Sequence, residues 1–126
     1  MDVCSQVAVA LDWLHARQVA HRDLKLENVL CRDDGATYVL CDFGSATTAV
    51  LPAERSRKAM LQEQEKIERY STQMYRAPEM VDLHRNWPVD ERVDVWALGC
   101  LVYELLHGHP PYYVRAQQSG SNRAVA

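Results

Sequence analysis

The chain has 126 residues and a net charge of −3, with 48% hydrophobic and 25% charged residues. This length suits one small domain with a modest core, and the charge gives no basic footprint for nucleic acid. The sequence has no run of eighteen or more apolar residues and no basic start followed by an apolar segment, so we expect neither a transmembrane helix nor a secretion signal. Four widely spaced cysteines favour reduced thiols in the cytosol over zinc or disulfides; they are Cys4, Cys31, Cys41 and Cys100.

Residues 3–18 are predicted to form an amphipathic helix. Its apolar side chains recur at helical spacing along one stripe, formed by Val3, Val7, Ala10, Leu11 and Leu14. We expect this stripe to face the core and the opposite side of the helix to face solvent.

Four polar residues whose side chains suit one reaction follow this helix within a short distance. They occur in His21-Arg22-Asp23-Leu24-Lys25-Leu26-Glu27-Asn28 and in Asp42-Phe43-Gly44. This combination suits phosphoryl transfer, because Asp23 can accept a hydroxyl proton and Lys25 can neutralise charge on a moving phosphoryl group. Asn28 and Asp42 offer the hard oxygen ligands that Mg²⁺ prefers.

The residues between these two motifs predict a β-hairpin. Residues 29–32 and 38–41 are short apolar runs that flank the turn-forming Asp33-Asp34-Gly35-Ala36. Because a hairpin brings the outer ends of its two strands together, we expect Asn28 and Asp42 to lie close to each other.

A long segment runs from Asp42 to Glu79, and its middle is highly charged. Residues 54–69 contain two charge pairs at helical spacing, and their apolar stripe is sparse. The pairs are Glu54/Lys58 and Glu65/Arg69, and the stripe is Met60, Ile67 and Tyr70. A docking helix is one interpretation, but the composition favours a mobile, solvated loop, and that is our prediction.

Residues 93–106 are predicted to form a helix that is apolar nearly all round and therefore buried. Asp90 is placed to cap its start, and Gly108 with Pro110-Pro111 ends it. Residues 114–126 are polar and small with no helical or strand period, so we expect a disordered tail.

Four motifs stand in a characteristic order along the chain. They are His21-Arg22-Asp23, Asp42-Phe43-Gly44, Ala77-Pro78-Glu79 and Asp94-Val95-Trp96-Ala97-Leu98-Gly99. In this order they resemble the C-terminal lobe of a eukaryotic-type serine/threonine protein kinase. The resemblance implies an α+β kinase-like fold, mostly helical with one β-hairpin, over residues 1–113. The glycine-rich loop and strand lysine of such kinases are not found before His21, nor the last helices after Tyr112, so we interpret the chain as a piece truncated at both ends, as an incomplete gene model would give.

The resemblance also implies ATP and Mg²⁺ as cofactors and assigns residues to them. Asn28 and Asp42 are expected to hold Mg²⁺, and Lys25 and Glu27 to contribute to the nucleotide site. Leu30 is expected to form the floor under the adenine ring, although an ordinary core leucine is equally compatible with the sequence.

Three further residues take roles only from the resemblance. Thr72 stands where serine/threonine kinases place a hydroxyl that bonds to the catalytic aspartate and lysine, here Asp23 and Lys25, and this favours serine/threonine specificity. Arg22 marks kinases whose activation segment can be ordered by a phosphate, and whether this chain uses that switch stays open. His21 could form an acid–base pair with its neighbour, but the fold implies a packing role against Phe43, held by Asp94.

Finer details resemble the Numb-associated kinases. These details are Cys41-Asp42-Phe43-Gly44-Ser45-Ala46-Thr47, Tyr75-Arg76-Ala77-Pro78-Glu79-Met80 and Trp96-Ala97-Leu98-Gly99-Cys100. The resemblance implies protein substrates among clathrin-adaptor or actin-regulatory proteins, with no nucleic-acid partner. It also implies a cytoplasmic location, peripheral at endocytic sites.

The sequence can also be compared with two other functions, a non-catalytic binding module and a small-molecule phosphotransferase. A catalytically inactive fragment or pseudokinase could act as a binding module that competes for the same partners. Small-molecule phosphotransferases share an aspartate–asparagine loop, but they typically lack the Ala77-Pro78-Glu79 and Trp96-Ala97-Leu98-Gly99 elements, which argues against them.

Overall fold

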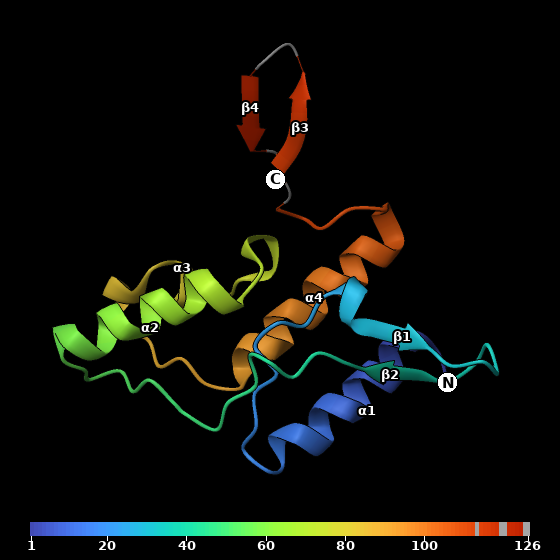
Figure 1. Cartoon of the computed structure of the whole chain (residues 1–126), viewed down its shortest axis with the longest axis horizontal. Helices are drawn as coiled ribbons and strands as arrows, with labels where there is room; N and C mark the ends of the chain where they lie inside the picture. Colours follow the sequence, from blue (N-terminus) through green and yellow to red (C-terminus); the bar gives the residue numbers. More distant parts are fainter. Residues whose placement is uncertain (113, 119–120, 125–126) are drawn as a thin grey trace.

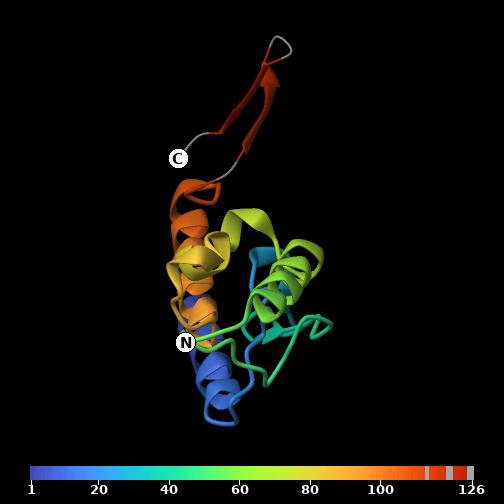
Figure 2. The same cartoon turned by 90° about the vertical axis from the view of Figure 1, so that its left-hand side faces the viewer.

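The structure, a computed structural model, describes residues 1–112, 114–118 and 121–124 (Figure 1). The helices and strands are α1 (Val3–His15), β1 (Val29–Cys31), β2 (Tyr38–Leu40), α2 (Arg57–Tyr70), α3 (Pro78–Val81), α4 (Arg92–His107), β3 (Val114–Gln118) and β4 (Ser121–Ala124). Short 3₁₀ turns lie at Leu26–Asn28, Gln73–Tyr75 and Leu83–Arg85. Figure 1 shows α4 between two groups of elements, α1 with the β1–β2 hairpin and α2 with α3, and Figure 2 shows that α4 runs along one edge of the molecule. This mixture of helices and two small two-stranded sheets among the described residues confirms the predicted α+β class.

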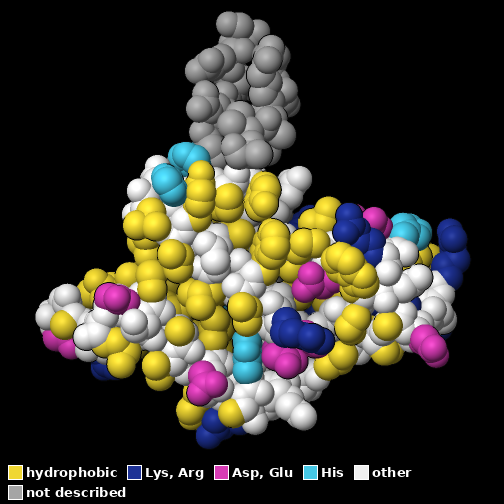
Figure 3. Space-filling model, turned by 180° about the vertical axis from the view of Figure 1, so that it is seen from behind, with side chains coloured by type: hydrophobic (Ala, Val, Ile, Leu, Met, Phe, Trp, Pro, Cys, Tyr) yellow, Lys and Arg dark blue, Asp and Glu magenta, His cyan; other side chains and the backbone are white. Residues whose placement is uncertain are grey.

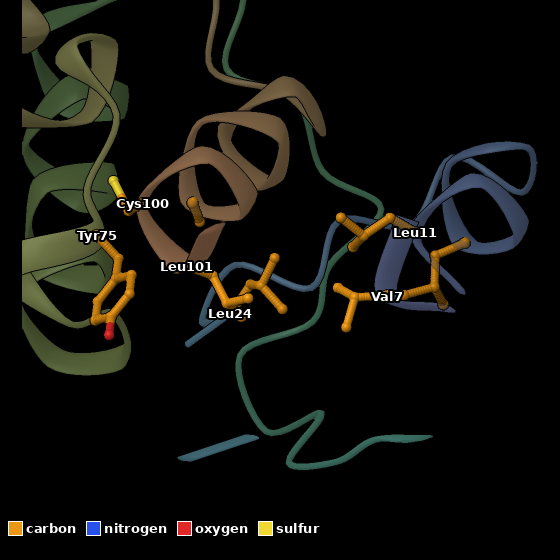
Figure 4. Packing of buried hydrophobic residues seen from close by; sticks show 8 residues of the cluster. Val7, Leu11, Leu24, Tyr75, Cys100 and Leu101 are labelled. Carbon is orange, nitrogen blue, oxygen red and sulfur yellow. The ribbon is translucent and has the colours of Figure 1, made fainter. Parts of the chain in front are cut away.

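Helix α1 packs its predicted stripe against α4 and the polar loop that follows it. Val7, Leu11 and Leu14 are buried and belong to one core cluster with Leu24 and Leu101, as Figure 4 shows for four of these residues. The helix begins where the Asp2 side chain accepts a hydrogen bond from the Ser5 backbone N–H at 2.8 Å. It ends three residues before the predicted end, because the chain turns there and Gln18 takes a left-handed conformation (φ 59°).

The hairpin has the predicted strands and turn. β1 and β2 pair antiparallel with Val29 opposite Leu40, and Gly35 supplies the left-handed residue of the turn (φ 68°). Gln6 on α1 bonds to the hairpin: its side chain donates to the Ala36 carbonyl and accepts from the Tyr38 backbone N–H. The hairpin is therefore fixed to α1 by hydrogen bonds between the Gln6 side chain and the hairpin backbone as well as by packing.

Asp34 organises the hairpin turn and leads to a pH prediction. Its carboxylate accepts hydrogen bonds from the Thr37 hydroxyl and from the backbone N–H groups of Ala36 and Thr37. The Thr37 hydroxyl is the largest of the causes that lower the Asp34 pKa from 3.8 to about 2. Because the folded pKa lies below the unfolded one, the contribution of this turn to stability is complete above pH 3.8 and is lost as the pH falls through about 2. An NMR titration of the Asp34 carboxyl carbon checks this.

Thr37→Val is the matched variant for that titration. It keeps the shape of the side chain but removes the hydroxyl donor, so the Asp34 pKa should rise toward 3.8. A wild-type Asp34 that already titrates at 3.8 would contradict the turn as described.

Helix α4 is buried on one face only, which corrects the prediction of a helix buried all round. Val93, Ala97 and Leu101 are buried, but Val95 and Leu106 are exposed, and Figure 3 shows many hydrophobic side chains on one face of the molecule. The reason is that the described neighbours of α4 pack against a single side of it. Its C-terminal end is as expected, because Gly108 stops the helix in a left-handed conformation (φ 83°). At the other end the capping position is Glu91 rather than the predicted Asp90, whose side chain lies one residue earlier and accepts from the Arg92 backbone N–H.

The charged middle of the long segment is a helix, so the predicted mobile loop is wrong. α2 runs from Arg57 to Tyr70, and its start is capped by the Ser56 side chain, which accepts from the Ala59 backbone N–H. Ile67 is 3% exposed and joins a second core cluster that includes Met80 and Val93. Burial of Ile67, packing of Ala59 and Met60 against the same cluster, and an ion pair between Glu63 and Arg22, rather than local composition, stabilise the helix.

β3 and β4 form an antiparallel pair in the stretch for which the sequence shows no strand period. Residues 113, 119–120 and 125–126 lie outside the described residues. The domain boundary after residue 113 and the disorder of residues 114–126 stay predictions. Among the described residues, no helix is long and apolar enough to cross a membrane. All four cysteines are free thiols.

Candidate active site

A buried carboxylate on α4 shapes the loop that carries the candidate catalytic residues. Asp94 is 1% exposed and accepts hydrogen bonds from the backbone N–H groups of His21 (2.7 Å) and Arg22 (2.9 Å). The His15 ring Nε2 lies 2.9 Å from the same carboxylate. These three partners satisfy a charge that would otherwise be costly to bury. They hold the loop so that Arg22 adopts a left-handed conformation (φ 73°) and Asp23 follows directly.

His21 has the predicted packing role. Its ring contacts the Phe43 ring edge-on, with centroids 5.0 Å apart. The Asp23 backbone N–H donates to Nδ1 and the Nε2 atom lies 2.9 Å from the Cys41 carbonyl, which can only accept. His21 is therefore the neutral tautomer with its proton on Nε2, and both ring nitrogens are occupied by structural bonds. It is not available as an acid or base.

The Thr72 hydroxyl connects the two candidate catalytic side chains. It donates to Asp23 Oδ1 at 2.7 Å and accepts from Lys25 Nζ at 2.9 Å, while Lys25 Nζ lies 3.9 Å from Asp23 Oδ2. Thr72 comes from the end of the long segment, 49 positions beyond Asp23. The contact that the resemblance implied is therefore present, and it places a carboxylate, an ammonium and a hydroxyl within one hydrogen-bonded group.

The two candidate magnesium ligands lie at adjacent ends of the hairpin. Asn28 is buried, and its side-chain N–H donates to the Asp23 carbonyl at 2.7 Å, which orients the amide and leaves Oδ1 as its acceptor atom. Asp42 is exposed, adopts a left-handed conformation (φ 61°) and accepts from the Gly44 backbone N–H. Backbone bonding of the Cys41 N–H to the Asn28 carbonyl joins the two ends. One amide oxygen and one carboxylate fit Mg²⁺, which binds to few protein ligands and completes its shell with phosphate and water oxygens.

The two remaining nucleotide residues of the prediction lie on the surface. Leu30 is 50% exposed and stands opposite Val39 in the hairpin, so it does not belong to the core that the described residues form. Glu27 is exposed in the 3₁₀ turn that precedes the hairpin. The adenine contact of Leu30 and the nucleotide contact of Glu27 stay predictions.

Glu63 is a site residue that the sequence analysis missed. Arg22 Nη2 donates to Glu63 Oε1 on α2, and the side chains of the two residues are only 9% and 11% exposed. No local pattern indicates this pair, because its partners are 41 positions apart. The only hint is that Glu63 stands four residues before Ile67, on the face that α2 buries.

Tyr75 anchors the end of the long segment onto α4. It is buried in the same core cluster as Cys100 and Leu101, as Figure 4 shows, and its hydroxyl donates to the Glu104 carboxylate. Burial, followed by this carboxylate, raises the Tyr75 pKa far above its usual range, so the phenol stays a hydrogen-bond donor. The Tyr75 backbone N–H donates to the Thr72 carbonyl at 3.0 Å, so the same anchor also holds Thr72.

The sequence of the chain is similar to those of known proteins. Residues 1–125 match the family model described as the protein kinase domain. The chain is 45% identical over 111 residues to the serine/threonine-protein kinase ppk30 of Schizosaccharomyces pombe, covering 88% of this chain and 11% of that protein. It is 39% identical over 114 residues to the actin-regulating kinase PRK1 of Saccharomyces cerevisiae, covering 89% and 14%, and 39% identical over 115 residues to serine/threonine-protein kinase 16 of Mus musculus, covering 91% and 37%.

These matches cover nearly all of the chain but only part of each relative. The chain spans between 11% and 37% of the length of these three proteins. The part that it spans contains the Asp23, Lys25 and Thr72 group, the hairpin and α4 described above. Because residues 1–125 match the family model and the chain is 45% identical to a kinase over 111 residues, the chain belongs to the protein kinase domain family.

Proposed function

We propose that the protein containing these residues transfers the γ-phosphoryl group of ATP to serine or threonine hydroxyls of other proteins. The observation that carries this proposal is the Thr72 hydroxyl bridging Asp23 and Lys25. It brings the segment that would receive the substrate chain against the two side chains suited to the chemistry. The names of the relatives, which are serine/threonine-protein kinases, support the same function.

In this mechanism each side chain has one task. The hydroxyl oxygen of the substrate bonds to the γ-phosphorus while the bond between that phosphorus and the bridging oxygen of ATP breaks. A carboxylate oxygen of Asp23 accepts the proton that the hydroxyl loses. Lys25, 3.9 Å from that carboxylate, stabilises the charge on the phosphoryl oxygens. Asn28 and Asp42 would hold Mg²⁺, which supplies charge neutralisation at the phosphates when bound.

The experiment uses the full-length protein, Mg²⁺ and ATP labelled in its γ-phosphate. Label should appear on serine and threonine of an added protein substrate mixture and should require Mg²⁺. If the full-length protein with its active-site residues unchanged transferred no label, or if the label were found only on tyrosine, the proposed function would be wrong.

We also propose that the protein acts in endocytosis or actin regulation, at endocytic sites in the cytoplasm. The support is the resemblance of its three finer motifs to Numb-associated kinases and the printed name of one relative, an actin-regulating kinase. Clathrin-adaptor and actin-regulatory proteins are the substrates this implies. Phosphorylation of a purified clathrin-adaptor subunit or actin regulator at a rate no higher than that of casein would count against this narrower proposal.

The 126 residues by themselves should show neither saturable Mg-ATP binding nor phosphorylation of a serine/threonine substrate. Within these residues Asp42 and Leu30 are exposed to water, where the high dielectric weakens charge contacts and the adenine would keep an apolar face uncovered. Transfer depends on positioning, which an open site provides poorly. Calorimetric titration with Mg-ATP and a kinase assay check this.

Robust transfer by the 126 residues that disappears in Asp23→Asn would contradict that expectation. An inactive piece that still captures a protein substrate would instead favour the alternative function, a binding module.

A further inference from the structure

Arg55 lies two residues before α2, and its guanidinium joins two stretches of chain that are far apart in the sequence. Nη1 donates to the Pro52 carbonyl at 3.1 Å and to the Trp87 carbonyl at 2.7 Å, and Nη2 donates to the Leu83 carbonyl at 2.6 Å. Leu83 and Trp87 belong to the α3–α4 loop, residues 82–91. The side chain therefore fixes this loop to the segment that leads into α2.

All the hydrogen bonds of the Arg55 side chain go to main-chain carbonyls. Among the described residues no carboxylate forms an ion pair with its guanidinium, and its Nε is buried without a hydrogen-bond partner. A planar guanidinium can reach three carbonyls through two of its nitrogens, whereas a lysine ammonium presents its donors from a single atom. The contact thus depends on the shape of the arginine side chain and not only on its charge.

The backbone of the α3–α4 loop gives these two carbonyls little support of its own. The Leu83 carbonyl accepts the Asn86 N–H at 3.4 Å, which is a long hydrogen bond, and within the described ranges no backbone N–H donates to the Trp87 carbonyl. Asn86, between them, takes a left-handed conformation (φ 57°). Arg55 is therefore the main donor that holds residues 83–87 in this shape.

The same loop forms one wall of a cavity beside the candidate catalytic residues. The cavity has a volume of about 310 Å³ and lies between α2, α3 and the loop, with Leu83 on the loop side and Gln73 on the opposite side. Gln73 directly follows Thr72, whose hydroxyl connects the two candidate catalytic side chains. The residues beside a phosphorylated serine or threonine would lie at this place.

We propose that Arg55 is a positioning residue for the protein substrate. By holding the carbonyls of Leu83 and Trp87 it fixes the wall of the cavity beside Thr72, and the chain next to the phosphorylated serine or threonine binds against this wall. The inference rests on the proposed function for its substrate, a protein with a serine or threonine hydroxyl. The hold of Arg55 on the α3–α4 loop does not require catalysis and can be measured separately.

The test compares the steady-state kinetics of full-length wild type, Arg55→Met and Arg55→Lys with γ-labelled ATP and the protein that the wild type labels most strongly. Both variants should raise the KM for that protein by roughly tenfold, the scale of a lost hydrogen bond to a charged group. The KM for ATP should stay the same, since Arg55 bonds to none of the candidate nucleotide residues. A general loss of folded protein would instead lower the apparent kcat and leave both KM values unchanged.

Arg57→Met and Arg57→Lys are the matched controls. Arg57 is an exposed arginine two positions further on, and its variants should behave as wild type. Hydrogen exchange gives a second measurement: in Arg55→Met the amides of residues 83–89 should exchange faster by roughly an order of magnitude, while those of α1 exchange as in wild type.

Wild-type protein provides a test that does not depend on how the variants fold. A saturating concentration of the same substrate protein should slow amide exchange in residues 73–84, which contribute to the cavity wall, relative to α1. The inference is wrong if bound substrate leaves these amides unchanged, if Arg55→Lys keeps the wild-type KM for the protein, or if the Arg55 and Arg57 variants behave alike. If residues 83–89 respond as expected but the wild type transfers no phosphate, the substrate role fails together with the proposed function, whereas the hold of Arg55 on the loop stands.

Discussion

Asp23→Asn should lower the rate of phosphoryl transfer by roughly two or more orders of magnitude, the scale of lost general-base help. The amide has nearly the same shape as the carboxylate and can still accept the 2.7 Å hydrogen bond from the Thr72 hydroxyl. It cannot take up the proton of an attacking hydroxyl. ATP affinity should be nearly unchanged, because Asn28, Leu30 and Asp42 are untouched. Measuring kcat and the Kd for ATP on the full-length protein separates the two effects.

The matched control for this change is Asp33→Asn. Asp33 is an exposed aspartate in the hairpin turn, away from the Thr72 group, and its amide variant should keep full activity. Turnover of Asp23→Asn equal to that of this control would end the assignment of Asp23 as the base.

Asp42→Ala should abolish Mg²⁺-dependent ATP binding while disturbing the fold little. The Asp42 side chain is exposed and makes a single hydrogen bond, at 3.3 Å to the Gly44 N–H, so its removal costs little beyond the strain of an alanine in the left-handed conformation of this residue. It is, however, the one carboxylate that the proposed metal site contains, and Asn28 alone offers only a neutral oxygen. Calorimetric titration with ATP in the presence and absence of Mg²⁺, beside a thermal melt, measures both properties.

Asp33→Ala is the corresponding control for binding. It removes another exposed aspartate near the hairpin and should leave Mg-ATP binding intact. Normal Mg-ATP binding by Asp42→Ala would show that Asp42 is only a turn residue.

Turn residues and the spacing of apolar residues were sufficient to predict the hairpin and α1 from the sequence. The turn residues Asp34 and Gly35 have side-chain bonds and a left-handed conformation that their types favour. The apolar stripe of α1 has the period of a helix, and Val7, Leu11 and Leu14 are buried as that period requires. In such elements short-range chemistry and tertiary structure agree, so the sequence alone predicts them.

The same signals failed for α2 because its stability depends on residues far away. Its composition is that of a solvated segment, and only Glu63 and Ile67 are buried. Their partners are Arg22 in the catalytic loop and the cluster around Met80 and Val93. No window of neighbouring residues contains this information.

Around the candidate catalytic residues, one contact was predicted from the sequence and another was not. The Thr72 contact to Asp23 and Lys25 was expected from motif order, which encodes the fold of a whole family. The pairing of Arg22 with Glu63 was not, since the motif specifies the arginine but not which group it meets. The extent of burial of α4 also escaped prediction, because an apolar sequence does not say how many neighbours cover it.

The most direct measurement of the central claim compares γ-labelled ATP turnover by full-length wild type, Asp23→Asn and Asp33→Asn with one serine/threonine protein substrate. The account predicts equal label on serine or threonine for wild type and Asp33→Asn, and loss of roughly two or more orders of magnitude for Asp23→Asn alone. Equal label from all three proteins would contradict it.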